Sequence, residues 1–221
     1  MSPRLLIRWS GLGTTVAGAL LALFPLLHPN HDPAGFTSWL WIPAHASIHV
    51  AVILTLFGLT GLLARQLERA GWLGLVGYVT AFFGSAGLLT IAMVELFIMP
   101  YMALQLGIGE DGSPPPGIGE AMMLISVVFA IGYMLLGAAT VRAGVVPRSV
   151  GILLAVAGAF FMLGDGVLGL VIDMERYWGI TFALFGAALA WLGYALWAEL
   201  TARHSETRRG QRTPRLVRAT R

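Results

Sequence analysis

Six long apolar stretches alternate with short polar gaps along the 221-residue chain. They run at about 9–28, 43–64, 72–99, 120–141, 149–172 and 178–199. Each holds about 20 residues or more, enough for a helix that rises 1.5 Å per residue to cross a hydrocarbon core ~30 Å thick. Because helices satisfy their own backbone polar groups inside a bilayer, the pattern predicts an all-α fold, a six-transmembrane-helix bundle.

The basic residues predict the orientation of this bundle. All fourteen are arginine, and thirteen of them lie before the first stretch, in every second gap, or after the last stretch. Arg176 is the exception. Because cytoplasmic loops carry an excess of Lys and Arg, the alternation predicts an N-in/C-in topology with both termini in the cytoplasm. The thirteen are Arg4, Arg8, Arg65, Arg69, Arg142, Arg148, Arg203, Arg208, Arg209, Arg212, Arg215, Arg218 and Arg221.

Composition narrows the class of protein. The chain is 57% hydrophobic and only 11% charged, where a soluble domain carries roughly a quarter charged residues. We therefore expect an integral membrane protein with one transmembrane domain, 1–202, and a disordered Arg-rich cytoplasmic tail, 203–221, held near anionic lipids. The net charge of +3 reflects topology rather than affinity for nucleic acid. The absence of cysteine excludes disulfides and thiolate chemistry.

A short motif gives a resemblance to known sequences. Pro147-Arg148-Ser149-Val150-Gly151 opens the fifth apolar stretch from the cytoplasmic side. In this respect the chain resembles a loose group of uncharacterised bacterial six-helix integral membrane proteins, best over the fourth and fifth stretches. The resemblance implies the same six-helix bundle, a multi-pass protein of a bacterial plasma membrane. In a bacterium with two membranes, this is the inner membrane. It implies no activity.

Ionisable residues at membrane depth are costly and mark candidate functional positions. His45 and His49 are four residues apart, so they share one face of a helix about 6 Å apart along its axis. Glu95 falls at the outer boundary of the third stretch, and Asp165 in the outer third of the fifth. Three helices therefore place these four side chains at one level, near the outer surface.

These four residues permit three interpretations. They are separate interfacial residues, or a divalent-metal site made by His45, His49, Glu95 and Asp165, or a metal-free acid–base site. In the last, Asp165 or Glu95 exchanges a proton with a lipid- or isoprenoid-like substrate, and His49 is the partner base. His28 and His31, in the outer gap, could fold over as further ligands. A haem held by both His45 and His49 is less favoured, because axial ligands approach the iron from opposite faces and these two histidines share one face of a helix.

Aromatic residues surround these candidates. Trp39 and Trp41 are expected to anchor the outer interface. Six further rings either line a cleft beside the acidic residues or pack the bundle: Phe82, Phe83, Phe97, Tyr101, Phe160 and Phe161.

The function predicted from sequence is a membrane enzyme with an outward-facing His/carboxylate site that acts on a hydrophobic substrate, with or without a metal. Two alternatives stay open. One is a non-enzymatic cofactor-binding or assembly subunit of a membrane complex. The other is a small-solute or proton-coupled transporter, which is disfavoured because no charge lies in the inner half of a stretch to continue a path.

Overall fold

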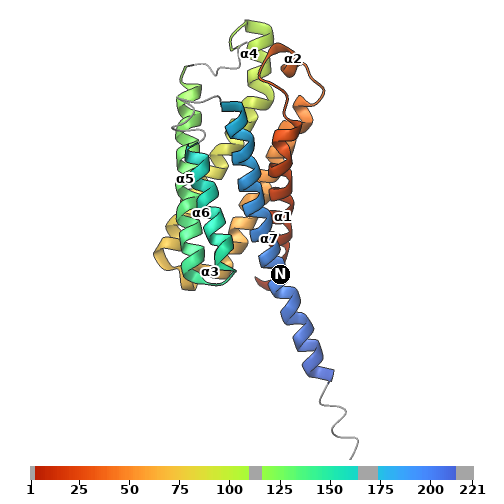
Figure 1. Ribbon diagram of the computed structural model, residues 1–221, viewed down its shortest axis with the longest axis vertical. Coiled ribbons are helices and arrows are strands. Elements are labelled where there is room, and N and C mark those ends of the chain that lie inside the picture. Colours follow the sequence, from red (N-terminus) through yellow and green to blue (C-terminus); the bar gives the residue numbers. More distant parts are fainter. Residues whose placement is uncertain (1–2, 110–115, 164–173, 213–221) are drawn as a thin grey trace, which may run out of the picture.

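Every regular element in the described part of the chain is helical, which confirms the all-α class. The computed structural model describes residues 3–109, 116–163 and 174–212, with side chains at 4–109, 116–163 and 177–198. Two short helices, α2 and α4, lie at one end of the bundle, called here the α4 end (Figure 1). The elements are α1 Pro3–Leu27, α2 Pro33–Phe36, α3 Trp41–Met93, the π-helix η1 Val94–Ile98, α4 Met99–Leu106, α5 Ile118–Ala143, α6 Arg148–Met162 and α7 Met174–Arg212.

Four helices within the described residues are long and apolar enough to cross a membrane. They are Arg4–Leu27, Trp41–Leu106, Ile118–Ala143 and Tyr177–Ala198. The apolar helix α6 is shorter, with 15 residues, and the part of the fifth apolar stretch beyond Leu163 lies outside the described residues. The sequence predicted six spans, against four here. The two counts differ because α6 is too short to be included and because one 66-residue span begins at Trp41, where the sequence predicted two spans.

The second of these spans is divided at Gly71. A straight helix of 66 residues would be about 99 Å long, but Gly71 has φ 59° and ψ −150°, which no helix contains. The chain turns there, at the end of the bundle opposite the α4 end, and we call this the Gly71 end (Figure 1). Residues 41–70 and 72–93 are thus two limbs of α3. The sequence placed a turn here, between its second and third stretches.

Close approach of backbones determines which helices are neighbours. The first limb of α3 lies against α1, where a Cβ on Gly58 would collide with Thr14. The second limb lies against α5, where a Cβ on Gly84 would meet the backbone of Phe129. Glycine also brings α5 close to α6, because a Cβ on Gly137 would meet the backbone nitrogen of Ala155 at 2.6 Å. The resulting core runs the length of the bundle and includes a buried aromatic group: Phe129, Tyr133, Phe161, Phe182 and Phe185.

The helix α7 continues to Arg212. Residues 203–212, part of the segment expected to be a disordered tail, are therefore helical, and 213–221 lie outside the described residues. A helix that is already formed extends at low cost, because only nucleation is strongly unfavourable. Arginine and glutamate are also good helix formers, so the polar composition that suggested disorder does not by itself end the helix.

The α1–α7 contact yields a matched pair of substitutions on one helix. A Cβ on Gly18 would collide with the backbone of Gly186 and Ala190, whereas a Cβ on Gly13 would make only ordinary van der Waals contacts with Leu54 and Phe57, the nearest at 3.5 Å. We expect Gly18→Ala to destabilise the protein by about 1–3 kcal/mol through overpacking. Gly13→Ala should be neutral or stabilising by up to about 1 kcal/mol, because alanine favours the helix. Thermal unfolding in detergent measures both, and equal effects would contradict this packing.

Candidate functional site

The segment between α1 and α3 is held in a defined shape at the α4 end. Asp32 caps α2 by accepting a hydrogen bond from the backbone nitrogen of Gly35 at 2.7 Å, and Pro33 occupies the first turn. Gly35 lies so close to the carbonyl of Asn30 that a Cβ would collide with it. Phe36 then packs against the ring of Trp41, with centroids 4.8 Å apart. These local contacts fix the positions of the two histidines that precede α2.

On the other side of the site, the helical register changes at Glu95. The backbone nitrogen of Met99 donates to the carbonyl of Val94, five residues back, as in a π-helix. In the same register, the Glu95 carbonyl would accept a hydrogen bond from the backbone nitrogen of residue 100. This residue is Pro100, which has no N–H. The indole nitrogen of Trp41 donates to this carbonyl instead, at 3.1 Å. The donor side chain is buried, because Trp41 is 2% exposed.

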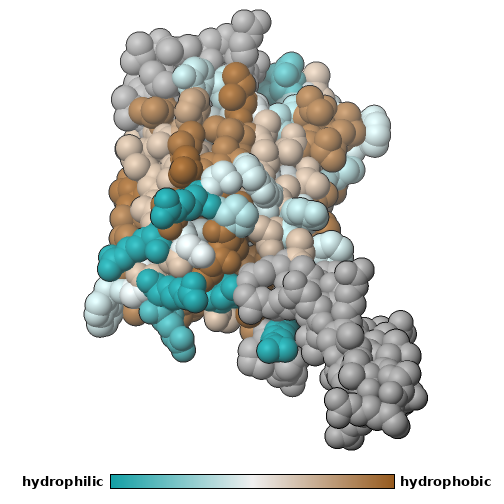
Figure 2. Space-filling view, turned by 60° about the horizontal axis from the view of Figure 1, so that its bottom comes forward, coloured by the Kyte–Doolittle hydropathy of each residue, from teal (hydrophilic) through white to brown (hydrophobic). Residues whose placement is uncertain are grey.

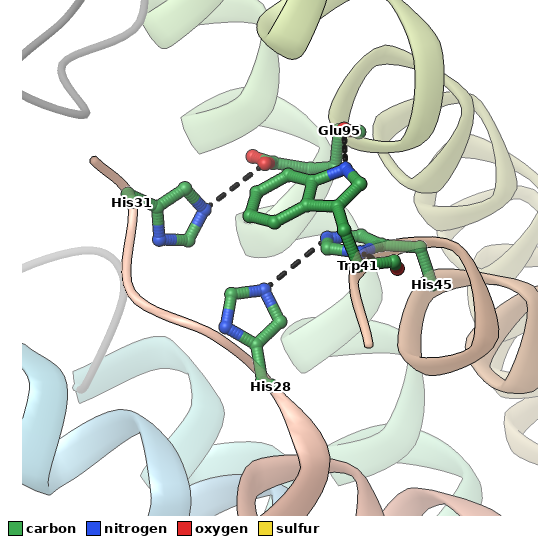
Figure 3. A network of polar contacts seen from close by, with 5 residues as sticks. All are labelled: His28, His31, Trp41, His45 and Glu95. Atoms are coloured by element: carbon green, nitrogen blue, oxygen red, sulfur yellow. Dashed lines mark hydrogen bonds and ion pairs between the residues drawn. The ribbon is translucent and has the colours of Figure 1, made fainter. Parts of the chain in front are cut away.

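Two pairs of polar side chains meet around Trp41 (Figure 3). His31 Nε2 lies 3.0 Å from Glu95 Oε2, which joins the loop to the π-helix. His28 Nε2 lies 3.2 Å from His45 Nε2, which joins the end of α1 to α3. The indole lies between the two pairs and stacks on the His45 ring, with centroids 4.2 Å apart.

The hydrogen-bond partners assign the proton positions on the histidines of α3. His45 Nδ1 lies 2.8 Å from the carbonyl of Trp41, and His49 Nδ1 lies 3.0 Å from the carbonyl of His45. A carbonyl only accepts, so Nδ1 carries the hydrogen in both rings. In neutral His45, Nε2 is then an acceptor, and the hydrogen between the two rings belongs to His28 Nε2. This pair transmits a proton only if both rings change tautomer.

His28 is held neutral. Burial, together with the nearby imidazoles of His45 and His31, lowers the pKa of His28 to about 3, against an opposing backbone hydrogen bond at Pro29. Burial has this effect because a low-dielectric surrounding disfavours the charged form. A neutral His28 matches its role as the donor to His45.

A cavity of about 300 Å³ lies beside these residues. Its lining comes from all the long helices, and its polar groups stand among apolar walls. The lining residues are Phe24, His28, His31, His45, Ile48, Leu88, Ile91, Ala92, Glu95, Gly119, Met122, Met123, Ser126, Phe161, Trp178 and Phe182.

The structure brings together two of the four predicted site residues. His45 and Glu95 line the cavity, and His28 and His31, which the sequence left as optional additions, join them. His49 lies one turn deeper and outside the lining; its Nε2 is buried with no hydrogen-bond partner among the described residues. Asp165 lies outside the described residues.

The predicted metal site has no counterpart among the residues described. No group of three or more His, Asp or Glu side chains in 4–109, 116–163 and 177–198 is arranged to hold a metal ion. Figure 3 shows the reason, because the two pairs face each other across Trp41 instead of converging on one point. The site of His45, His49, Glu95 and Asp165 stays a prediction that depends on Asp165.

The structure bears on the eight aromatic residues that the sequence singled out. Trp39 is 80% exposed, so its role as an interfacial anchor stays a prediction, but the same prediction for Trp41 is wrong, because that ring is buried and packs against Phe36. Of the six rings proposed to line a cleft, Phe161 does so. Three are largely exposed on the outside of the helices: Phe83, Phe97 and Tyr101. Phe82 packs on the core, and Phe160 is half-buried outside the lining.

Sequence reasoning did not anticipate Trp41, Trp178 or Ser126 in the site. One available signal was Pro100 five residues after Glu95, since a proline inside an apolar helix leaves a carbonyl in need of a donor. Comparison of the chain with protein-family models, with curated proteins and with solved structures finds no match. The resemblance to bacterial six-helix proteins therefore stays a prediction.

The low pKa of His28 makes stability depend on pH. Between pH 6.5 and 3 the unfolded chain binds a proton at His28 that the folded chain does not, so this residue lowers stability as the pH falls, and has no such effect above 6.5. We expect thermal midpoints measured from pH 7 to pH 4 to fall more steeply for the wild type than for His28→Gln, which retains a donor. Histidine ¹⁵N NMR should show His28 neutral at pH 5, and titration of His28 near 6.5 would contradict its burial.

Proposed function

We propose that the protein crosses the membrane six times, with both termini on the cytoplasmic side of a bacterial plasma membrane. The turn at Gly71 supports this count, because it converts one overlong span into two. The start of α1 lies at the same end of the bundle as the point where the C-terminal part of α7 leaves it (Figure 1). Figure 2 shows hydrophilic residues gathered at the Gly71 end and hydrophobic residues along the flank. By the positive-inside rule, the arginines assign that end to the cytoplasm.

In this orientation the cavity faces the outer leaflet. We propose that it binds a hydrophobic small molecule and that its polar groups carry out acid–base chemistry on it, as a membrane enzyme. The observation that carries this proposal is the cavity itself, with apolar walls and one polar region that holds an imidazole–carboxylate pair and an imidazole–imidazole pair. Sites for small molecules combine mostly apolar walls with a few placed polar groups.

The two pairs have different roles in such a reaction. Glu95 is the proton acceptor or donor, and His31, whose Nε2 lies 3.0 Å away, orients the carboxylate. His28 presents a neutral ring whose Nε2 donates a hydrogen bond to His45. His45 is a positioning residue, because its own Nδ1 hydrogen is held by the Trp41 carbonyl. Asp165 stays a candidate second acid.

The same contacts argue against proton-coupled transport through these histidines. A proton on His45 Nδ1 faces a backbone carbonyl, which accepts a hydrogen bond but passes nothing onward. His49, one turn deeper, ends in the same way at the His45 carbonyl. A non-enzymatic cofactor-binding subunit would use the same cavity and differs from an enzyme in leaving the bound molecule unchanged.

Extraction of the bound molecule tests this proposal. We expect purified wild-type protein to yield a stoichiometric hydrophobic compound by solvent extraction and mass spectrometry. Ala92→Phe should reduce its amount at least about tenfold, because the added ring fills a buried part of the lining. Val50→Phe, at an exposed position on the same helix, is the matched control.

A third variant separates an enzyme from a binding subunit. Glu95→Gln retains the shape of the side chain but removes its proton exchange, so it should still hold the compound while the converted form disappears from the extracts. Retention of the same compound in unchanged form by both proteins would favour the binding subunit. A wild-type protein whose bound compounds match those of Ala92→Phe would contradict the proposed use of the cavity.

A further inference from the structure

Ser126 supplies a polar group from the opposite side of the cavity. It belongs to α5, whereas the histidines and Glu95 belong to the end of α1, the α1–α3 segment, α3 and η1. The residue is 6% exposed, and its hydroxyl forms no hydrogen bond with another described residue. Because this side chain lines the cavity, its hydroxyl is available to donate a hydrogen bond to, or accept one from, a polar atom held inside.

The charges around the cavity favour an uncharged ligand. No arginine is among its lining residues in the described part of the chain, and the whole sequence contains no lysine. Glu95 is already paired with His31, and His28 is neutral at physiological pH because burial lowers its pKa to about 3. Among the described lining residues, a phosphate or carboxylate head group would therefore find no arginine or lysine to compensate its charge.

The walls favour a flat ring. Phe24, Phe161, Trp178 and Phe182 contribute aromatic surface, and Met122 and Met123 contribute thioethers. Aromatic rings pack well against other rings, and methionine sulfur makes favourable contacts with ring edges. The volume of about 300 Å³ is at the lower limit for ligand sites, so it accommodates a head group while a long tail remains outside.

We propose that the cavity binds the ring of a quinone- or hydroquinone-type lipid, with one ring oxygen hydrogen-bonded to the histidine–glutamate side and the opposite ring oxygen to Ser126. This inference rests on the proposed function, because it names the class of molecule that the same cavity takes. It concerns binding alone. A ring with oxygen atoms on two edges satisfies polar groups from two walls at once, which an acyclic alcohol with a single oxygen cannot do.

Binding of three probes tests the class of ligand. Isothermal titration calorimetry on the full-length protein in nanodiscs compares a decyl-tailed benzoquinone with dodecanol and with dodecanoate. We expect saturable quinone binding at least about tenfold tighter than that of either acyclic probe. Ser126→Ala should weaken quinone binding by about 3- to 10-fold, the effect of one hydrogen bond, and Ser126→Thr should retain it.

The matched control is Ser47→Ala on α3. Its hydroxyl is bonded to the Ala44 carbonyl, and it does not line the cavity, so quinone affinity should not change. If dodecanol binds as tightly as the quinone or more tightly, the preference for a ring is contradicted. If dodecanoate binds more tightly, the preference for an uncharged head group is contradicted. Either result leaves the proposed use of the cavity intact. If none of the probes binds, the quinone class is rejected. The cavity proposal falls as well only if extraction also recovers no compound that Ala92→Phe removes.

Discussion

The Glu95 carbonyl must find a hydrogen-bond donor inside an apolar bundle, and the arrangement of the site depends on how it does so. An unpaired backbone carbonyl away from water costs about as much as a lost hydrogen bond, and more in lipid. The π-register and Pro100 together deprive this carbonyl of its backbone partner. The Trp41 indole replaces that partner, and so joins the start of α3 to η1, 54 residues later in the sequence.

The rest of the site follows from the position of Trp41. Its ring packs against both Phe36 and His45, and its backbone carbonyl sets the His45 tautomer. The His28 and His31 side chains then meet His45 and Glu95 on either side of the indole. Structural hydrogen bonds thus arrange the polar groups, while glycine contacts along the helices bring the walls close enough to enclose a small cavity.

The apolar stretches and the arginines were sufficient to predict the helical class, the turn at Gly71 and the proximity of His45 to Glu95. They were not sufficient to decide which side chains converge. His49 shares a helix face with His45, yet its Nδ1 is bonded to the His45 carbonyl and the residue lies outside the cavity lining. Trp41 looked like an anchor, because composition does not reveal that a carbonyl 54 residues away lacks a donor. The helical part of the tail, 203–212, shows likewise that charge alone does not end a helix.

A double-mutant cycle between Trp41 and Pro100 tests most directly whether the indole replaces a missing amide. Trp41→Phe keeps a ring but removes the donor, and should lower the free energy of unfolding by about 1–3 kcal/mol. Pro100→Ala restores an N–H five residues after Glu95, so it should recover part of that loss in the Trp41→Phe background and have a smaller effect in the wild type. An identical effect of Pro100→Ala in both backgrounds would show that the two residues do not serve the same carbonyl.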